Sequence, residues 1–448
     1  MRVMKWSMIA LAVTAASTQL ATAAPFVSDQ SEAKGFVEDA KLTETLKNYY
    51  FNRDNKNGGH DQKDWTQGFL GNFTSGYTQG TVGVGIDAFG YLAVKLDGGD
   101  GTTGTGNMSR SNTVKANGYA HDVDESQGKA GAAIKFRISK TELKIGDQQP
   151  TTAPVFAIGG SRILPQTASG FQLQSSEVKD LDLEAGHFYS ATSQDKNARD
   201  GGLYATYAGV EAKNIDYFGG KYGITDNLTA SLYGAKLQDI WNQYYANVNL
   251  TTPFGGDTSL NTDFNIYRTT DTGSAKAGDI SNTAFSLATA LSFLKAHTFT
   301  LAFQKVNGDT PFDYIGVGKN NRGGDSIFLA NSIQYSDFNG AGEKSLQARY
   351  DLKMAEYGVP GLSFMVRYVK GWDIDGTHTP AGSAYAGLYG EDGKHHETNF
   401  EAKYVVQSGP AKDLSFRIRQ AWHVANADEG EGDVKEFRLI TEYPLNIL

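Results

Sequence analysis

Residues 414–423 read LSFRIRQAWH, and this stretch carries the pattern on which the fold depends. Successive side chains of a β-strand point to opposite faces, so Arg417 and Arg419 share one face while Phe416 and Ile418 share the other. In a soluble sandwich the apolar face would be the core and the arginines would lie in water. In a membrane barrel the apolar face would meet lipid and the arginines would line the lumen. The rest of the chain decides between these two architectures.

The N-terminal segment, residues 1–23, predicts export. It has two early basic residues, Arg2 and Lys5, followed by an apolar run and an Ala-Thr-Ala sequence at 21–23. This arrangement is typical of a cleavable secretory signal, so we expect the mature chain to begin near Ala24. No later window approaches the roughly 18 to 20 consecutive apolar residues of a membrane-spanning helix. We therefore expect an exported protein without a helical anchor.

The composition favours β-structure and excludes several functions. The chain has no cysteine, which rules out disulfides, thiolate metal sites and cysteine nucleophiles. It has 52 glycines, 23 tyrosines and 24 phenylalanines but only ten prolines, a balance that favours many short strands joined by turns. Loss of the two bases of the signal segment would change the net charge from −9 to −11, which argues against a nucleic-acid partner.

The length is compatible with one large barrel. Removing 23 residues from 448 leaves 425, without a linker-like change of composition between possible domains. At about 10 residues for each membrane strand plus turns and loops, this length predicts roughly 16 to 18 strands, in an even number. We therefore predict an all-β, transmembrane antiparallel β-barrel formed by a single domain, residues 24–448.

Three non-periodic segments interrupt the alternating pattern. Residues 97–129 are rich in Gly, Asn, Ser and Asp, and predict a polar loop on the outer side of the barrel. Residues 150–174 and 308–340 are too apolar and aromatic for exposed loops, so we expect both to fold into the lumen and pack there. Between and after them the alternation is regular, as in residues 299–304 and 346–353.

Short runs along almost the whole chain resemble the OprD family of substrate-specific outer-membrane porins. Those that carry the resemblance include NYYFNRD (48–54), DWTQGF (64–69), FGYLAVKLDG (89–98), PVFAIGGSR (154–162), GDSIFLANS (324–332), QYSDFNG (334–340), YVVQSGPAKDLSFRIRQAW (404–422) and EYPLNIL (442–448). The resemblance weakens in residues 103–128 and 371–390, the loops in which family members would differ in selectivity.

The resemblance implies an 18-stranded monomeric barrel in the Gram-negative outer membrane, in contact with lipid and lipopolysaccharide. Inward loops would leave a narrow constriction, the eyelet. A series of cations, here termed the basic ladder, would guide carboxylate-bearing solutes, and it comprises Arg53, Arg162, Lys403, Arg417, Arg419 and Arg438. The opposite side of the eyelet, here termed the polar wall, would comprise Tyr207, Tyr314, Ser332, Tyr335 and Asp337. The inward direction of Arg53 and Tyr207 rests on the resemblance alone.

These residue types suit passive conduction of solutes with two opposite charges. Arginine forks replace the hydration that a carboxylate loses in a narrow pore, and several spaced cations let the anion move without a deep trap. Asp337 on the other side would receive an ammonium or guanidinium group. We therefore expect basic amino acids and small peptides as substrates, with no cofactor. By resemblance, carbapenem antibiotics would pass as well. Arg349, Arg367 and Asp351 are interpreted instead as solvated or paired lumen charges.

Three alternatives remain open from the residues. The first is a porin for other carboxylates, such as aromatic acids. The second is an outer-membrane hydrolase that would use His423 with Asp337 and Ser332, although nothing in the sequence places the three together. The third is a secreted, soluble β-rich binding protein. His395 and His396 adjoin an acidic residue, but we expect them in a solvated loop and predict no metal site there.

Overall fold

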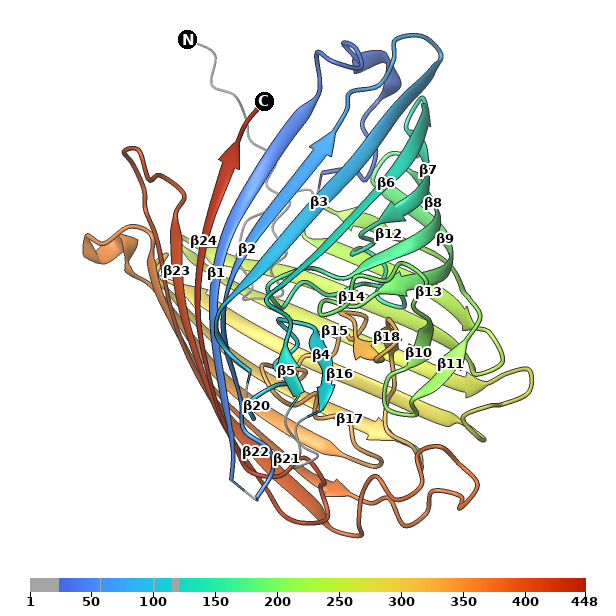
Figure 1. The fold of residues 1–448 in the computed structure, drawn as a ribbon, viewed down its shortest axis with the longest axis vertical. Helices are drawn as coiled ribbons and strands as arrows, with labels where there is room; N and C mark the ends of the chain where they lie inside the picture. Colours follow the sequence, from blue (N-terminus) through green and yellow to red (C-terminus); the bar gives the residue numbers. More distant parts are fainter. Residues whose placement is uncertain (1–23, 57, 100, 115–120) are drawn as a thin grey trace.

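The wall of the molecule is one closed sheet of 18 antiparallel strands (Figure 1). The computed structural model describes residues 24–56, 58–99, 101–114 and 121–448. The predicted signal segment, 1–23, lies outside these ranges. Each strand pairs with its neighbours in chain order, and β1 closes the sheet by pairing with both β2 and β24. The prediction of an antiparallel barrel with an even number of strands is confirmed, at 18.

The strands of the wall are much longer than those of an ordinary soluble sheet. They are β1 (Lys41–Asn55), β2 (Gln62–Thr74), β3 (Val82–Gly98), β6 (Ser126–Ile138), β7 (Thr141–Gln148), β8 (Thr167–Ser175), β9 (Leu181–Thr192), β12 (Ile215–Thr225), β13 (Leu228–Leu237), β14 (Trp241–Gly255), β15 (Thr258–Asp271), β16 (Ser281–Phe293), β17 (His297–Asn307), β20 (Lys344–Lys353), β21 (Leu362–Ile374), β22 (Gly393–Val405), β23 (Ser415–Ala425) and β24 (Val434–Asn446). Two 3-10 turns, η1 (Gln30–Glu32) and η2 (Met354–Tyr357), complete the wall and its N-terminal approach. No helix in the described ranges is long and apolar enough to cross a membrane.

The outer face of the wall is apolar and the inner face is polar. In β23, Phe416, Ile418 and Trp422 are about two-fifths exposed on the outside, whereas Arg417 and Arg419 are only partly accessible on the inside. This is the arrangement that the alternation in residues 414–423 predicts for a membrane barrel. Apolar side chains that face outward around the whole sheet remove the need for a soluble core, because lipid covers them.

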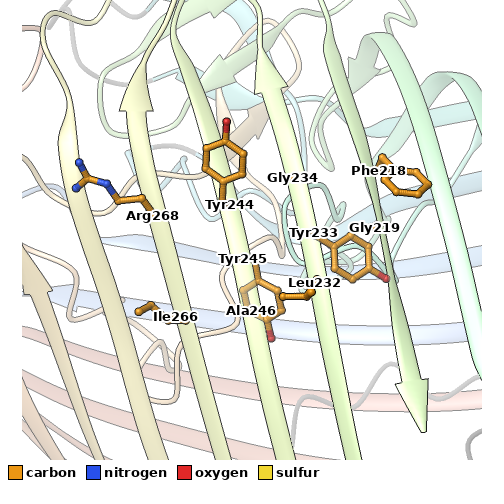
Figure 2. A pocket seen from close by; sticks show the side chains of 10 residues that line it. All are labelled: Phe218, Gly219, Leu232, Tyr233, Gly234, Tyr244, Tyr245, Ala246, Ile266 and Arg268. Atoms are coloured by element: carbon orange, nitrogen blue, oxygen red, sulfur yellow. The ribbon is translucent and has the colours of Figure 1, made fainter. Parts of the chain in front are cut away.

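The outer wall also has a shallow hollow, which Figure 2 shows at the ends of β12 to β15 next to the long loops. Gly234 lies opposite Phe218 on one neighbouring strand and Tyr244 on the other, so the missing side chain leaves the depression. Phe218 and Tyr244 are both more than half exposed, and Arg268 lies at the edge of the hollow. The hollow therefore faces the membrane and not the lumen.

The connections at one end of the barrel are long, and several of them turn inward. They carry two small sheets: β4 (Arg110–Val114) pairs with β5 (His121–Val123), and β10 (Leu203–Ala205) lies between β11 (Val210–Ala212) and β18 (Ile315–Val317), which pairs with β19 (Arg322–Gly323). In Figure 1 these small strands lie within the outline of the barrel. The inward loops fill part of the lumen and narrow it.

The connection at 149–166 packs against the inner wall through apolar side chains. Phe156 is fully buried, and its ring lies 4.7 Å from that of Phe188 on β9 and 6.1 Å from that of Tyr217 on β12. The predicted inward segment 150–174 is therefore too long at its C-terminal end. From Thr167 onward the chain is β8, a wall strand. Gly170 and other small residues in β8 weaken the alternation of apolar and polar side chains that would have indicated a strand.

The segment 97–129 does not form a purely external loop, contrary to the prediction. Wall strands occupy both of its ends, because β3 continues to Gly98 and β6 begins at Ser126. Between them, Asn107 and Met108 are buried, and the Asn107 side chain donates to Asp64 and accepts the Ile163 backbone N–H, both within 2.9 Å. Polar side chains can pack inward here because hydrogen bonds satisfy them.

Candidate functional site

Three arginines of the basic ladder meet around one aromatic ring. Arg53 on β1, Arg162 in the connection 149–166 and Arg438 on β24 each place the guanidinium carbon 5.2 to 5.3 Å from the centre of the Phe51 ring. Phe51 is fully buried, so its ring offers a fixed apolar face for the three planar cations. The structure therefore brings together side chains that are 385 positions apart at the extremes.

A carboxylate that the sequence did not single out holds two of these arginines. Glu436 accepts from Arg53 Nε at 2.8 Å and from Arg438 Nε at 2.6 Å, and its side chain is fully buried. Arg438 is itself only 4% exposed and also donates to the Gln334 carbonyl. Arg438 therefore has a structural role in addition to its charge. The alternating pattern of β24 could have indicated Glu436, which shares the inward face with Arg438.

Arg162 differs from its neighbours because no carboxylate in the described ranges pairs with it. Its Nε donates to the Thr105 carbonyl at 2.7 Å, and Nη1 donates to Ser161. Burial, together with the positive charge of Arg438, lowers the pKa of Arg162 to about 10, at which it is still a cation at neutral pH. Arg162 is thus the member of this group with the most charge available for a solute.

The other rungs of the basic ladder follow in register across neighbouring strands. Lys403 lies opposite Arg417, and Arg419 lies opposite Arg438. Directly opposite residues of antiparallel strands have Cβ atoms about 4.5–5.5 Å apart, so the cations form a continuous line along the inner wall. Glu401 accepts from Arg417 at 2.7 Å and lies 3.3 Å from Arg419. The Nε atoms of both arginines are buried, and the Arg419 Nε atom is the one that lies 3.3 Å from Glu401.

Four of the five predicted polar-wall residues form one cluster. Asp337 accepts hydrogen bonds from Ser332 Oγ at 2.6 Å and from the hydroxyls of Tyr207 and Tyr314, both at 2.9 Å. No lysine or arginine in the described part of the chain forms an ion pair with Asp337. Its negative charge is therefore fixed in position by hydroxyl groups and remains uncompensated by a protein cation.

Asp313 organises this cluster and was missed in the sequence, although it adjoins Tyr314. Its carboxylate accepts the backbone N–H groups of Tyr207, Ala208 and Tyr314 at 2.9, 3.1 and 2.7 Å, and the Tyr385 hydroxyl at 3.0 Å. Burial raises the pKa of Asp313 to about 6. One carboxylate thus fixes both loops that supply tyrosines to Asp337.

Tyr335, the fifth predicted residue, lies between the two sides. It makes no hydrogen bond to Asp337; instead its ring lies 4.9 Å from the Arg53 guanidinium carbon. Its backbone N–H donates to Glu397 Oε1 at 3.2 Å, which attaches the loop to β22. Placing Tyr335 wholly opposite the arginines is therefore wrong, because the loop passes close enough for direct contact with Arg53.

The remaining charge predictions have mixed outcomes. Arg349 forms two 2.7 Å hydrogen bonds to Asp351, in agreement with its interpretation as a paired charge. Arg367 is buried and donates to the neutral Asn399 amide, so it is neither solvated nor paired with a carboxylate in the described ranges. The expectation of a solvated loop around His395 is wrong. His395 lies on β22 and is 3% exposed, because the strand begins two residues earlier, at Gly393.

Comparison with known proteins identifies the family. The model of the OprD family of outer membrane porins matches residues 34–447. The chain is 66% identical to Porin D of Pseudomonas aeruginosa over the full length of both, and 34% identical to the porin-like protein GalP of Pseudomonas putida over 94% of this chain and 95% of that one.

Solved structures agree with the sequence relatives. A crystal structure of Pseudomonas aeruginosa OprD has a TM-score of 0.83 and 63% identity, covering 95% of this chain and all of that one. The structure of Pseudomonas aeruginosa OpdK with vanillate has a TM-score of 0.79 and 33% identity, covering 92% of this chain and all of that one. These relatives are porins, which are channels and not enzymes, so the hydrolase and secreted-protein alternatives are excluded. The chain belongs to the OprD family and is a substrate-specific porin of the Gram-negative outer membrane.

Proposed function

We propose that the pore conducts small solutes that carry a carboxylate at one end and a cation at the other, with basic amino acids and short basic peptides preferred. The observation that supports this most strongly is that one inward loop carries Asp337 and also reaches the basic ladder. Asp337 is held by three hydroxyls and forms no ion pair with a lysine or arginine in the described ranges, and Tyr335, two positions earlier, lies 4.9 Å from the Arg53 guanidinium carbon.

The ladder accounts for movement as well as selection. An anion that leaves Arg162 meets Arg438 and Arg419 and then Arg417 and Lys403 on adjacent strands. Glu401 partly compensates Arg417 and Arg419, so neither of these two rungs is a deep trap. The cationic end of the solute is stabilised by Asp337 while its carboxylate is transferred to the ladder. A solute without a cation gains only the second interaction.

Single-channel recording with added arginine, glutamate or benzoate tests the proposal. We expect Asp337→Asn to weaken binding of arginine and leave glutamate and benzoate unchanged. The double variant Arg417→Ala/Arg419→Ala should weaken all three, because each has a carboxylate. Arg268→Ala is the matched control, since this arginine is exposed on the outer wall. Unchanged binding of all three solutes in the Arg417→Ala/Arg419→Ala channel would contradict the ladder. Stronger binding of benzoate than of arginine by the native channel would favour the aromatic-acid alternative.

The proposal extends to carbapenems, which combine a carboxylate with, in many members, a cation. Antibiotic-driven swelling of liposomes that contain the porin measures their passage. We expect the swelling rate to fall in the Asp337→Asn channel for cationic carbapenems only. Equal rates for native and Asp337→Asn channels would contradict this extension.

We also propose that residues 1–23 are removed on export and that the barrel acts as a monomer in contact with lipid and lipopolysaccharide. The apolar outer wall and the hollow beside Arg268 support the lipid contact (Figure 2). N-terminal sequencing of the membrane form should begin near Ala24. Light scattering on the detergent-extracted protein should give the mass of one chain after subtraction of detergent, and a trimer mass would contradict the monomer.

A further inference from the structure

Two histidines and two glutamates meet inside the barrel, away from the basic ladder. His395 on β22 and His423 on β23 are 3% and 1% exposed, and their Nδ1 and Nε2 atoms lie 2.9 Å apart. Glu429 Oε1 lies 3.4 Å from His395 Nδ1, and Glu431 Oε2 lies 3.5 Å from His423 Nε2. The four ligand atoms all lie within 4.8 Å of one another.

In each imidazole, the nitrogen that points away from the other histidine, Nδ1 of His423 and Nε2 of His395, has its own hydrogen-bond acceptor. His423 Nδ1 lies 2.8 Å from the Gly432 carbonyl oxygen, which can only accept, so this nitrogen carries a proton. His395 Nε2 lies 2.8 Å from Glu343 Oε1, a buried carboxylate that likewise takes an N–H. His395 Nδ1 and His423 Nε2 then face each other at 2.9 Å, so this contact requires a shared cation, either a proton that bridges the two nitrogens or a metal ion that binds both.

The surrounding charges point to the same requirement. Glu343, Glu429 and Glu431 gather here, and no lysine or arginine in the described part of the chain forms an ion pair with any of them. Glu431 Oε2 is buried without a hydrogen-bond partner. A buried carboxylate oxygen with nothing to accept from is costly unless a cation binds to it.

We infer that His395, His423, Glu429 and Glu431 form a binding site for a divalent transition-metal ion, with Zn²⁺ as the best fit. Two imidazole nitrogens and two carboxylate oxygens are a ligand set suited to Zn²⁺. Tetrahedral bonds of about 2.0–2.1 Å place neighbouring ligand atoms about 3.3 Å apart, close to the three separations of 2.9, 3.4 and 3.5 Å. Ca²⁺ and Mg²⁺ prefer sites composed of oxygen atoms, and Cu²⁺ prefers a tetragonal arrangement.

Glu343 and the Gly432 carbonyl hold the two imidazoles from the side opposite the ion. In metal proteins the ligating imidazole donates its other N–H to a carboxylate or backbone carbonyl, which fixes the ring and its tautomer. Both forms of that contact are present here. Glu431 retains 27% of its side-chain exposure, which gives an ion a route into the otherwise buried cluster.

The site adjoins the eyelet, so an ion there would affect the pore. The Phe338 ring stacks on His395 at 4.1 Å, and the Tyr335 ring lies 4.9 Å from that of His423. The Tyr335 hydroxyl also donates to the Glu431 carbonyl at 3.2 Å. Tyr335 and Phe338 flank Asp337 in the chain. A metal ion would therefore join β22, β23 and the connection 426–433, and would stiffen the loop that presents Asp337.

Zinc titration of the full-length porin tests the inference. The protein should be produced without a histidine tag, extracted from outer membranes in detergent, stripped with a chelator and titrated with Zn²⁺ by calorimetry at pH 7.5. We expect one Zn²⁺ per chain, with zinc X-ray absorption spectra that fit two nitrogen and two oxygen ligands. Absence of saturable binding, or a bound ion without histidine ligands, would overturn the inference and would leave the proposed solute selectivity unaffected.

Variants locate the ion. His423→Gln and Glu431→Gln should each weaken Zn²⁺ binding about 100-fold, and Glu343→Gln about 10-fold, as expected for ligands and for a group that holds a ligand in place. His396→Gln is the matched control, because His396 is next in sequence to His395 but lies on the opposite face of β22. Heat-modifiable mobility identifies any variant that fails to fold. Equal affinity in the native, His423→Gln and Glu431→Gln proteins would overturn the site.

A second readout concerns the eyelet. Saturating Zn²⁺ should raise the melting temperature and reduce open-channel current fluctuations in the native and His396→Gln proteins, and should do neither in His423→Gln. If the cation between the imidazoles is only a proton, Zn²⁺ will change neither quantity in the native protein, and the inference fails.

Discussion

Replacing Glu401 with glutamine should make the channel more selective for anions. Glu401 lies 2.7 Å from Arg417 and 3.3 Å from Arg419, so it compensates part of the charge of two successive rungs. Glutamine keeps the shape and one acceptor but removes the negative charge. The local charge of this group then changes from +1 to +2, while the fold is conserved.

The size of the effect follows from Coulomb's law. For an anion about 5 Å from the Glu401 carboxylate, removal of one negative charge in water is worth about 0.8 kcal/mol, or about a fourfold increase in anion occupancy. With a Debye length of about 10 Å in 0.1 M salt, the gain falls to about 0.5 kcal/mol, or roughly twofold. In 1 M salt, with a Debye length of about 3 Å, it nearly disappears.

Reversal potentials across a tenfold KCl gradient measure this change. The Glu401→Gln potential should shift towards the chloride equilibrium value at low salt, and the shift should fade as salt rises. Asp413→Asn is the control, because it removes one charge from an exposed turn and asparagine tolerates the positive φ of that position. An equal shift in both variants, or a shift that persists in 1 M salt, would refute a local effect on the ladder.

Three further predictions concern the loops that fold into the barrel. Burial raises the folded-state pKa of Asp313 to about 6 from an ordinary value of 3.8. Protonation of Asp313 therefore favours the folded state. This contribution to stability is complete below about pH 4 and is lost as the pH rises through 6. The melting-temperature difference between the native protein and Asp313→Asn should accordingly shrink between pH 4 and pH 7, and a widening difference would contradict the burial argument. Phe156→Ala should lower the free energy of unfolding by about 3–5 kcal/mol, because the side chain is fully buried. Phe218→Ala, on the lipid face, should lower the free energy of unfolding far less. Similar urea midpoints for the two variants would argue against tight loop packing. Tyr314→Phe removes one of the three hydroxyls that donate to Asp337. Because a hydrogen bond to a charged group contributes about 1.5–3 kcal/mol, the variant should weaken arginine block of single channels about tenfold. Unchanged block would show that Asp337 does not need this donor.

The wall of the barrel could be predicted from the sequence because alternation is a local property. Phe416 and Arg417 are adjacent in the chain, and the geometry of a strand alone places them on opposite faces. The inward turn of residues 150–166 was also predictable, because Val155, Phe156 and Ile158 are too apolar to remain in water. The boundary at Thr167 was not, since Gly170 and small residues weaken the period-2 signal in β8.

Contacts between segments far apart in the sequence could not be predicted from the sequence. Glu436 was not singled out until β1 and β24 closed the barrel and brought Arg53 to it. Asn107 lies in a segment whose polar composition is typical of an external loop, yet it is buried because Asp64 accepts its amide hydrogen bond. Composition records whether a segment is polar, but not whether partners exist for its polar groups.

The sequence by itself determined that this chain is a membrane barrel with cations on the inner face of its last strands, because strand geometry converts residue parity directly into direction. Only the tertiary structure decided which polar side chains meet: Asp337 accepts hydrogen bonds from the hydroxyls of Tyr207 and Tyr314, and His395 pairs with His423. The physical reason is that closing the sheet and folding several loops into it places side chains from distant segments within a few ångströms, and no local pattern encodes that distance.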